Sequence, residues 1–353
     1  MTEPRALQLC PNDHPPFLEL CRVHAKALTI AGFQVDTVFL APPRGLPDID
    51  AHYLDVAGGS LRMALALTRH LADRRYALTV AHRYRALRVA VAARRTHRLG
   101  RIICIAHEYG LFERFRRRLW QRMLARDVMF AGVSAPVAAQ MLEQQPSLAP
   151  VAVLPNAIDL DAFDAALLAR AEARRQLNLP SDACLVAVVG RLHAKKRPEL
   201  ALRGFEEAFA ALPPNAHLVF VGEGEERATL ERSIAHSTLE GCVTLTGAVP
   251  GVARYFAAFD LLLATSSEAE AFGMVLLEAM AARLPILCAD VPGPRSVLGH
   301  DGAYFADVHD LAAKLIDATT QGAGHQRDRL EENFTAAGLA QRYRELLDTR
   351  VRT

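Results

Sequence analysis

The chain has 353 residues, of which 51% are apolar and 23% are charged, a balance that excludes a disordered protein and suffices for two ordinary hydrophobic cores. No run of 18 or more uncharged apolar residues occurs and no basic and apolar leader opens the chain, so we expect neither a membrane-spanning helix nor a secretory signal. Six cysteines without a CxxC pair argue against a disulfide framework or a zinc site and favour a reduced, cytoplasmic protein.

Charge is distributed unevenly along the chain. Residues 1–150 carry 21 Lys/Arg and 12 Asp/Glu, a balance of +9, whereas residues 151–353 carry 20 and 27, a balance of −7. A basic first half is expected to meet an anionic partner, although compositional drift in an arginine-rich proteome would give the same numbers. We expect no nucleic-acid partner.

Short apolar strands alternate with helical stretches along the first half. Strands are expected at Ala6–Cys10, Gln34–Leu40, Ala77–Ala81, Arg101–Ala106, Val128–Val133 and Val151–Leu154. The helices between them include Leu18–Ala31, Leu61–Leu71 and Ala86–Leu99. Apolar strands separated by helices are typical of a parallel sheet that is covered on both faces.

The second half repeats this pattern after a turn at Pro155 and Asn156. A helix is expected over Ala165–Leu177 and a final amphipathic helix over Asn333–Leu347. Strands are expected at Cys184–Val189, His217–Val221, Val243–Leu245, Leu261–Ala264 and Ile286–Ala289. We therefore predict two doubly wound α/β domains, at residues 1–160 and 161–332, with the C-terminal helix of about 333–353 counted with the first domain.

A basic loop follows the first strand of the second half. The apolar strand ends at Gly190, and Arg191 and Lys196 come next. Glycine lets the chain turn tightly, Arg191 can grip phosphate oxygens through two donors, and Lys196 can add a compact charge. The loop predicts a site for a departing diphosphate, although such a loop can also be merely solvated.

Two carboxylates, Glu270 and Glu278, stand eight residues apart on either side of Gly273. We expect a helix to begin near Gly273, so that its free N–H groups point at an anion. Glu270 then lies on the loop, and Glu278 lies about one and a half turns into the helix. Apolar residues surround Glu278, so its carboxylate must bind hydroxyl groups or form an ordinary buried salt bridge.

Together and in order, these stretches resemble glycosyltransferase family 4, a family of retaining GT-B enzymes. The stretches that carry the resemblance are Gly132–Ser134, the hinge Leu154–Asp159 with Phe163, Gly190–Lys196, Val221–Gly224 and Glu270–Glu278. The resemblance implies a GT-B fold, in which two Rossmann-like domains face a central cleft. It also implies that the first domain binds the acceptor and the second binds the nucleotide-sugar donor.

The resemblance assigns roles to individual residues. Arg191 and Lys196, after Gly190, would hold the donor diphosphate, and Glu270 would lie beside the donor sugar. Glu278 would bind the ribose hydroxyl groups. Further donor contacts would come from Phe272 and from the backbone of Gly273, Met274 and Val275. The main chain of Gly247–Val249, including Val249, would surround the base. His107 would lie under the donor sugar.

Some positions depart from the family pattern. Pro11–Pro16 stands where many relatives carry a Gly-Gly loop, which puts the contacts of that loop in doubt, and Arg295 takes a place that is often acidic. The Asp159–Asp161 pair resembles a metal-binding D-x-D, but it falls in the hinge and is interpreted as turn and helix-capping chemistry. We expect no metal and no other cofactor.

The predicted function is transfer of a sugar, with retention, from a UDP-, GDP- or ADP-type donor to an envelope glycan or glycolipid such as lipopolysaccharide core. The alternatives are a soluble phosphorylated or small-molecule acceptor, a GT-B epimerase or phosphorylase, and a non-catalytic nucleotide-sugar-binding module.

Residues 112–126 carry Phe112, Phe115, Leu119 and Met123 on one helical face and six arginines elsewhere. This pattern favours peripheral contact with an anionic membrane, unless the apolar face packs on the first domain's sheet.

Overall fold

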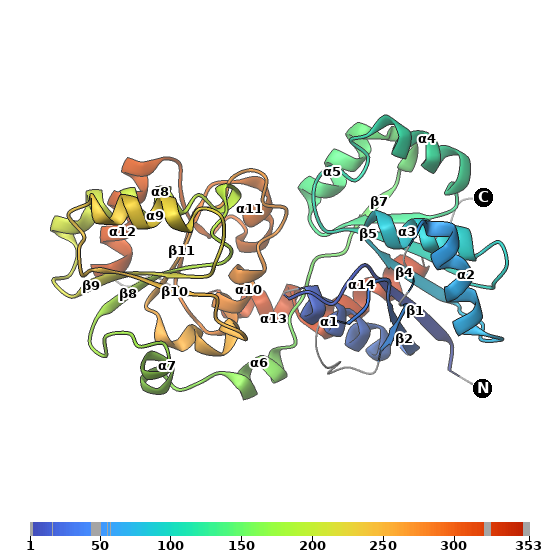
Figure 1. Cartoon of the computed structure of the whole chain (residues 1–353), viewed down its shortest axis with the longest axis horizontal. Helices are drawn as coiled ribbons and strands as arrows, with labels where there is room; N and C mark the ends of the chain where they lie inside the picture. Colours follow the sequence, from blue (N-terminus) through green and yellow to red (C-terminus); the bar gives the residue numbers. More distant parts are fainter. Residues whose placement is uncertain are drawn as a thin grey trace. The chain divides into compact units, whose positions relative to one another are not determined.

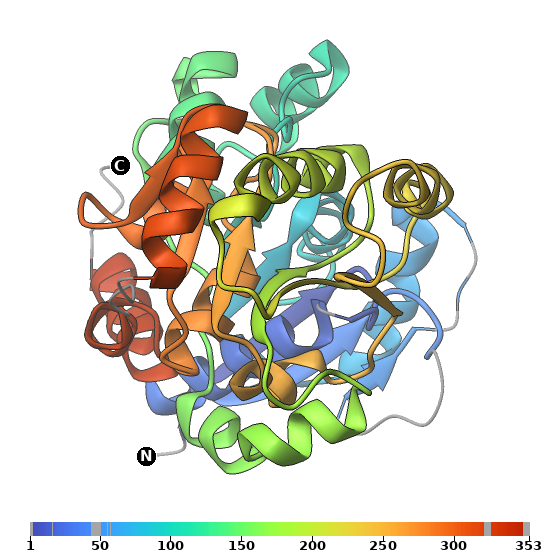
Figure 2. The same cartoon turned by 90° about the vertical axis from the view of Figure 1, so that its left-hand side faces the viewer.

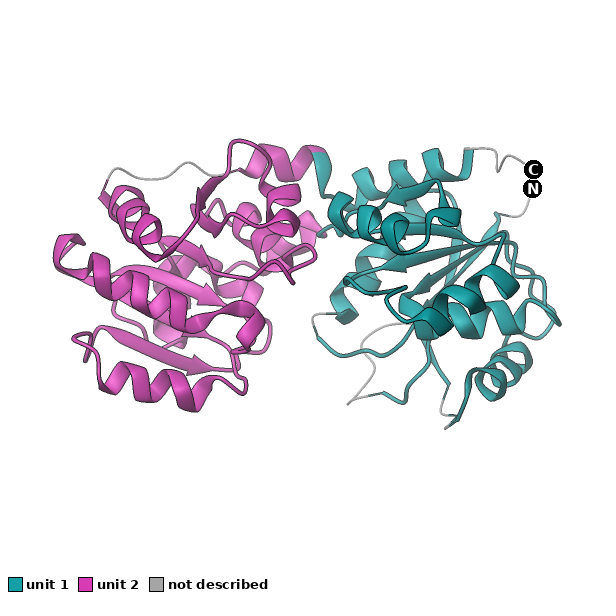
Figure 3. Ribbon diagram, turned by 90° about the horizontal axis from the view of Figure 1, so that it is seen from above, with its two compact units in different colours: residues 1–158, 333–353 teal, residues 159–332 magenta. Residues whose placement is uncertain are grey.

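The computed structural model describes residues 3–15, 17–43, 51–54, 56, 58–320 and 326–348. The chain forms two compact units, one of residues 1–158 with 333–353 and one of residues 159–332 (Figure 3). Each unit is built around a single parallel sheet with helices, as expected for two doubly wound domains (Figure 1). Within the described parts of the chain, no helix has the length and apolar character that crossing a membrane requires.

The first unit has a seven-stranded parallel sheet in the order β3-β2-β1-β4-β5-β6-β7. Its strands are β1 (Arg5–Cys10), β2 (Gln34–Phe39), β3 (His52–Tyr53), β4 (Leu78–His82), β5 (Arg101–Ala106), β6 (Met129–Gly132) and β7 (Val151–Val153). Six of these strands were expected from the sequence. The two-residue edge strand β3 was not, because so short a segment has no measurable periodicity.

Helices cover the two faces of this sheet. They are α1 (Phe17–Ile30), α2 (Ser60–Leu71), α3 (Arg83–Ala93), α4 (Phe115–Leu124), α5 (Ala135–Gln144) and α14 (Ala336–Asp348). The C-terminal helix α14 packs against α1, and its Tyr343 is fully buried there. The expected C-terminal helix is therefore present, and it completes the first unit in space.

Helix α4 differs from the expectation for residues 112–126. Phe112 precedes the helix and is fully buried, 5.4 Å from Phe130 between ring centroids. Phe115, Leu119 and Met123 are 68%, 47% and 65% exposed, so the alternative in which they pack on the sheet is wrong. The helix instead turns Gln121 inward, where its side chain accepts a hydrogen bond from that of Gln145 at 2.9 Å.

The second unit has a six-stranded parallel sheet in the order β10-β9-β8-β11-β12-β13. This unit faces the viewer in Figure 2. Its strands are β8 (Cys184–Val189), β9 (Ala216–Val221), β10 (Val243–Gly247), β11 (Leu261–Ala264), β12 (Ile286–Ala289) and β13 (Ala303–Phe305). Its helices are α6 (Leu160–Ala166), α7 (Arg170–Gln176), α8 (Pro198–Ala208), α9 (Arg227–Ala235), α10 (Met274–Ala281), α11 (Pro292–Leu298), α12 (Val308–Thr320) and α13 (Arg327–Asn333).

The single helix expected over Ala165–Leu177 is wrong, because two short helices, α6 and α7, stand there. The chain between them is extended, and the Leu168 N–H donates to the Arg254 carbonyl at 2.9 Å. This tertiary hydrogen bond outweighs the local helix propensity. Asp159 caps α6 by accepting a bond from the Ala162 N–H at 3.3 Å, which confirms the capping interpretation of the hinge aspartate.

Both sheets reverse their strand order at one place. In the first unit this switch point lies between β1 and β4, and in the second between β8 and β11. The loops that follow two such strands leave in opposite directions, and open parallel sheets bind ligands in the crevice that results. In each unit, a ligand site is therefore expected at the carboxyl ends of the two strands that flank the switch point.

Candidate functional site

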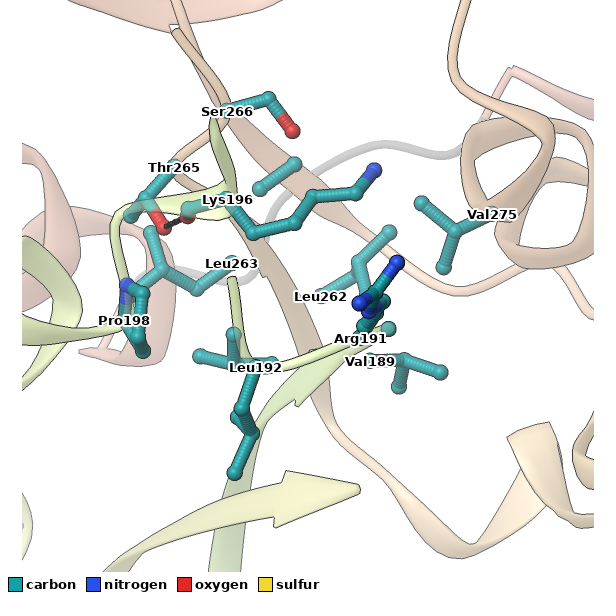
Figure 4. Close-up of a pocket in the computed structure, with 13 residues that line it drawn as sticks. Val189, Arg191, Leu192, Lys196, Pro198, Leu262, Leu263, Thr265, Ser266 and Val275 are labelled. Carbon is teal, nitrogen blue, oxygen red and sulfur yellow. Dashed lines mark hydrogen bonds between the residues drawn. The ribbon is translucent and has the colours of Figure 1, made fainter. Parts of the chain in front are cut away.

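A pocket lies at the switch point of the second unit (Figure 4). Its walls are Val188–Leu192, Lys196, Pro198, Leu262–Ser266 and Val275. The loop after β8 supplies Gly190, Arg191 and Lys196. Figure 4 shows the side chains of Arg191 and Lys196 among the residues that line the pocket. The structure therefore brings these three predicted residues to one pocket.

Lys196 also joins the pocket to the first carboxylate of the predicted pair. Its ammonium donates to Oε2 of Glu270 at 2.6 Å, and the Lys195 ammonium lies 4.0 Å from the other carboxylate oxygen. Glu270 is only 9% exposed. A buried carboxylate needs such partners, because desolvating an unpaired charge is expensive.

The ionisation of Glu270 follows from these neighbours. Burial by itself raises the pKa of the Glu270 carboxyl, but the Lys196 ammonium and hydrogen bonds from Lys196 and Ser266 outweigh burial. The pKa consequently lies below its usual value, so that Glu270 carries a negative charge at neutral pH. The pocket therefore has a fixed ion pair at one wall and an exposed guanidinium, Arg191, at its rim.

Two close backbone contacts hold these loops in place. A Cβ atom on Gly222 would lie 1.9 Å from the Gly190 carbonyl oxygen, and Gly222 has a φ of +150°. A Cβ atom on Gly293 would lie 2.0 Å from the Glu270 carbonyl oxygen. Only glycine fits at either position, so the Gly190 turn and the Glu270 loop are each set by a neighbouring glycine.

Helix α10 begins immediately after Gly273, whose φ of +99° suits glycine. No side chain caps this N-terminus, and Val275 from its first turn lines the pocket. Glu278 follows Val275 by three residues and therefore lies on the same face of the helix. It is half-buried and has a partner in the structure. The predicted order is thus realised: the carboxylate of Glu270 and Gly273 lie in the loop before α10, and Glu278 lies in the helix.

The remaining predicted donor residues lie near these elements but do not all line the pocket. Met274 follows Gly273 in α10, and Phe272 is buried just before it. Val249 follows β10 at an edge of the same sheet and is not among the residues that line this pocket. Among the described residues, no group of three or more His, Cys, Asp or Glu side chains could hold a metal ion.

Sequence reasoning missed Arg197. Its φ of +48° is unusual for a side-chain-bearing residue, and its guanidinium donates to the carbonyls of Thr265 and Ser266 at 2.7 and 2.9 Å. The Thr265 hydroxyl donates back to the Lys196 carbonyl at 2.7 Å. Arg197 therefore clamps the two loops of the pocket together. The run of three basic residues, Lys195–Arg197, was the available signal.

His107 lies in the first unit, directly after β5, in a cluster of buried imidazoles. Its Nε2 is 2.9 Å from Nδ1 of His82, which ends the neighbouring strand β4. His24 of α1 packs edge-on against His82 at 4.8 Å and bonds the Tyr343 hydroxyl at 2.7 Å. The sequence singled out His107, and the fold brings His82, His24 and Tyr343 into the same cluster.

All three imidazoles of the cluster are neutral at physiological pH. Burial lowers the pKa of His24 to about 3. Burial, followed by the charges on neighbouring groups, lowers the pKa values of His82 and His107 well below the usual range. Neutral rings can share the His82–His107 hydrogen bond, with one nitrogen donating and the other accepting.

Two doubly wound parallel units in series, each with its switch point, have the GT-B class of fold. Residues 169–336, just under half of the chain, match the family model described as Glycosyl transferases group 1. The resemblance stated from the motifs is therefore confirmed.

Solved structures of the same fold cover almost the whole chain. Anabaena HepE in complex with UDP matches with a TM-score of 0.79 and 20% identity, over 98% of this chain and 100% of that chain. A glycosyltransferase from Rickettsia africae ESF-5 matches with a TM-score of 0.80 and 14% identity, over 99% of this chain and 100% of that one. At these identities the likeness concerns the fold, and the predicted GT-B class is confirmed.

Curated relatives share more sequence over shorter stretches. The D-inositol 3-phosphate glycosyltransferase of Thermobispora bispora is 31% identical over 226 residues, 58% of this chain and 52% of that protein. The N-acetyl-alpha-D-glucosaminyl L-malate synthase of Bacillus anthracis is 32% identical over 149 residues, 39% of each chain. The chain spans between 35% and 52% of the length of the curated relatives it matches.

Proposed function

We propose that this protein is a retaining, nucleotide-sugar-dependent glycosyltransferase whose donor diphosphate binds in the pocket after β8 and β11. The observation that carries the proposal is the Lys196–Glu270 ion pair at the switch point, beside the open N-terminus of α10. Cations and unpaired backbone N–H groups that converge on one pocket suit a diphosphate. The UDP-bound Anabaena structure of the same fold supports a nucleotide-sugar donor.

The chemistry follows from the charge that develops on the donor. An acceptor hydroxyl oxygen forms a bond to the anomeric carbon while the bond from that carbon to the diphosphate oxygen breaks. The electron pair leaves with the diphosphate, whose oxygen takes the hydroxyl proton. Arg191, Lys196 and the α10 N–H groups offset the charge on the leaving group, and this is where such groups accelerate a reaction most.

Within this proposal, Glu270 lies by the donor sugar and Glu278 binds the ribose hydroxyl groups. Val249 frames the base through its main chain, and His107 is a sugar-binding residue of the first unit. The first unit binds the acceptor and the second binds the donor.

Donor binding is tested by thermal-shift screening with UDP-, GDP- and ADP-sugars, which also assigns the base. A ligand at 100 times its Kd adds about 2.7 kcal/mol of stability, so the correct nucleotide stands out. Slow hydrolysis of that donor without acceptor separates an enzyme from a binding module. An NMR spectrum of the product reports retention directly, and epimerised or phosphorolysed donor would assign the alternative GT-B activities instead.

The acceptor is proposed to be a glycolipid at an anionic membrane surface, such as lipopolysaccharide core, which the protein approaches as a peripheral protein from the cytoplasm. Exposed Phe115, Leu119 and Met123 form an apolar stripe on α4, and exposed Arg116 and Arg122 flank it. An apolar stripe between arginines suits the headgroup region, where each arginine contributes about 1 kcal/mol.

Flotation with vesicles of phosphatidylcholine and phosphatidylglycerol tests this surface. Binding should decrease with salt and should be lost in a Phe115→Ser/Leu119→Ser/Met123→Ser variant. Ile30→Ser, at an exposed apolar position on α1, is the matched control and should float like the wild type. A wild-type protein that stays at the bottom of a low-salt gradient favours the soluble phosphorylated or small-molecule acceptor.

A further inference from the structure

The first unit has a switch point of its own, between β1 and β4. Arg83 lies there, as the residue after β4 and the first residue of α3. Phe17, the first residue of α1, approaches the same place from the β1 side. Ligands of open parallel sheets bind at this position, which makes the side chains found there candidates for binding.

The Arg83 guanidinium is held in one orientation. Its central carbon lies 4.7 Å from the centroid of the Phe17 ring, in a cation–π contact. The edges of the same ring meet the imidazoles of His82 and His107, at centroid distances of 5.8 and 5.3 Å. Phe17 is itself buried, so the platform under the guanidinium is rigid.

The hydrogen-bonding capacity of Arg83 is largely unused. Its Nε–H is buried and has no hydrogen-bond partner. One terminal nitrogen donates to Oε1 of Glu108 at 3.2 Å, and the Glu108 side chain is 65% exposed. A buried donor without an acceptor is unfavourable, and an oxyanion beside the guanidinium would offset its charge.

Within the described residues, one carboxylate, that of Glu108, forms an ion pair with Arg83. The imidazoles beside it, His82 and His107, are neutral, and the Arg83 charge contributes to the lowering of both their pKa values. The α3 N-terminus at Arg83 has no side-chain cap, so its first N–H groups and the helix dipole add to the positive potential.

We propose that Arg83 and the first turn of α3 form a phosphate-binding subsite in the first unit. The guanidinium, on a side chain that is 41% exposed, would bind two phosphate oxygens through its terminal nitrogens, in the fork geometry that arginine offers and lysine does not. The phosphate can come from the donor diphosphate or from a phosphorylated acceptor. Its use in sugar transfer rests on the proposed function, whereas phosphate binding itself does not.

The test is an NMR titration of the full chain with inorganic phosphate, in the presence and absence of saturating UDP. The Arg83 Nε–H signal is assigned by its loss in Arg83→Lys. With UDP bound, phosphate should shift this signal saturably if the subsite serves an acceptor phosphate. If UDP alone shifts the signal and removes the phosphate response, the subsite serves the donor diphosphate, and the proposal also holds.

Two further variants make the result specific. In Arg83→Gln, the backbone N–H signals of Tyr84 and Arg85 should need at least about tenfold more phosphate to shift, the effect of losing a charge-assisted bond. Arg88→Gln removes the same charge from an exposed position of α3 and should respond like the wild type. The proposal is overturned if neither phosphate nor UDP moves the Arg83 signal, or if both glutamine variants weaken the response equally. Because the readout is binding, a protein that transfers no sugar would still report on this subsite.

Discussion

The Nζ atom of Lys196 lies 2.6 Å from Oε2 of Glu270, and this ion pair joins the loop after β8 to the loop after β11. The two residues are 74 positions apart in the chain, and the strand order of the second unit brings them together. The carboxylate of Glu270 therefore lies within hydrogen-bond distance of the ammonium that is proposed to bind the diphosphate.

Replacing Lys196 or Arg191 by alanine should lower turnover by more than about a hundredfold, because a lost contact to transition-state charge costs about 3–4 kcal/mol. In Lys196→Ala the pKa of Glu270 should also rise, since Lys196 is the largest influence that lowers it. Initial rates and their pH dependence measure both effects. Lys314→Ala, at an exposed lysine in the same unit, is the control, and near-normal turnover in both site variants would contradict the diphosphate role.

Glu278→Ala should weaken the binding of the free nucleoside diphosphate and of the sugar nucleotide alike, because the ribose is common to both ligands. Glu270→Ala should weaken mainly the sugar nucleotide, because its proposed partner is the sugar. Isothermal titration calorimetry with both ligands separates the two roles. Equal losses for both ligands in both variants would show that this division is wrong.

Gly293→Ala should lower turnover without unfolding the second unit. An added Cβ would lie 2.0 Å from the Glu270 carbonyl oxygen, so the loop that carries this carboxylate must move. Gly59→Ala is the matched control, because nothing lies within 4 Å of its Cβ position. Steady-state rates decide the outcome, and wild-type turnover in Gly293→Ala would mean that the Glu270 position is not critical.

Activity should persist in EDTA and should not rise when magnesium or manganese is added. The motivation is the set of fixed cations and backbone donors at the proposed diphosphate site, which can supply the charge that a metal supplies elsewhere. Rate measurements after exhaustive dialysis against chelator provide the check. Loss of activity that magnesium or manganese restores would refute metal independence.

The first unit should lose stability as the pH falls below about 6.5, the usual pKa of an unfolded histidine. His24, with a pKa of about 3, is neutral in the fold, so the unfolded chain binds the extra proton and is favoured in acid. Each such histidine costs about 1.4 kcal/mol per pH unit over this window.

The single tryptophan, Trp120, lies in α4 of the first unit, so its fluorescence follows that unit during urea unfolding. His24→Gln should flatten the pH dependence between pH 7 and pH 5. His300→Gln, at an exposed position of the second unit, should leave it unchanged. A wild-type midpoint that does not move with pH would contradict the prediction.

The sequence alone determined the class of fold, because short apolar strands alternate with helical stretches in both halves, and this alternation is typical of a parallel sheet covered on both faces. It also singled out the proposed donor residues of the second unit, since Gly190, Arg191 and Lys196 follow β8, and Glu270 and Gly273 precede α10, in short motifs. Such residues are set by local requirements, a tight turn or a helix start, and these requirements are visible in a few consecutive letters.

Only the tertiary structure decided which distant groups meet. The Lys196–Glu270 pair, the His24–Tyr343 bond and the Phe17 platform under Arg83 each join segments that no periodicity relates. It also decided that Phe115, Leu119 and Met123 face outward, where the amphipathic pattern fitted either direction. The reason is physical: a pattern records which side chains share a face, whereas the surface that this face meets depends on the packing of the whole unit.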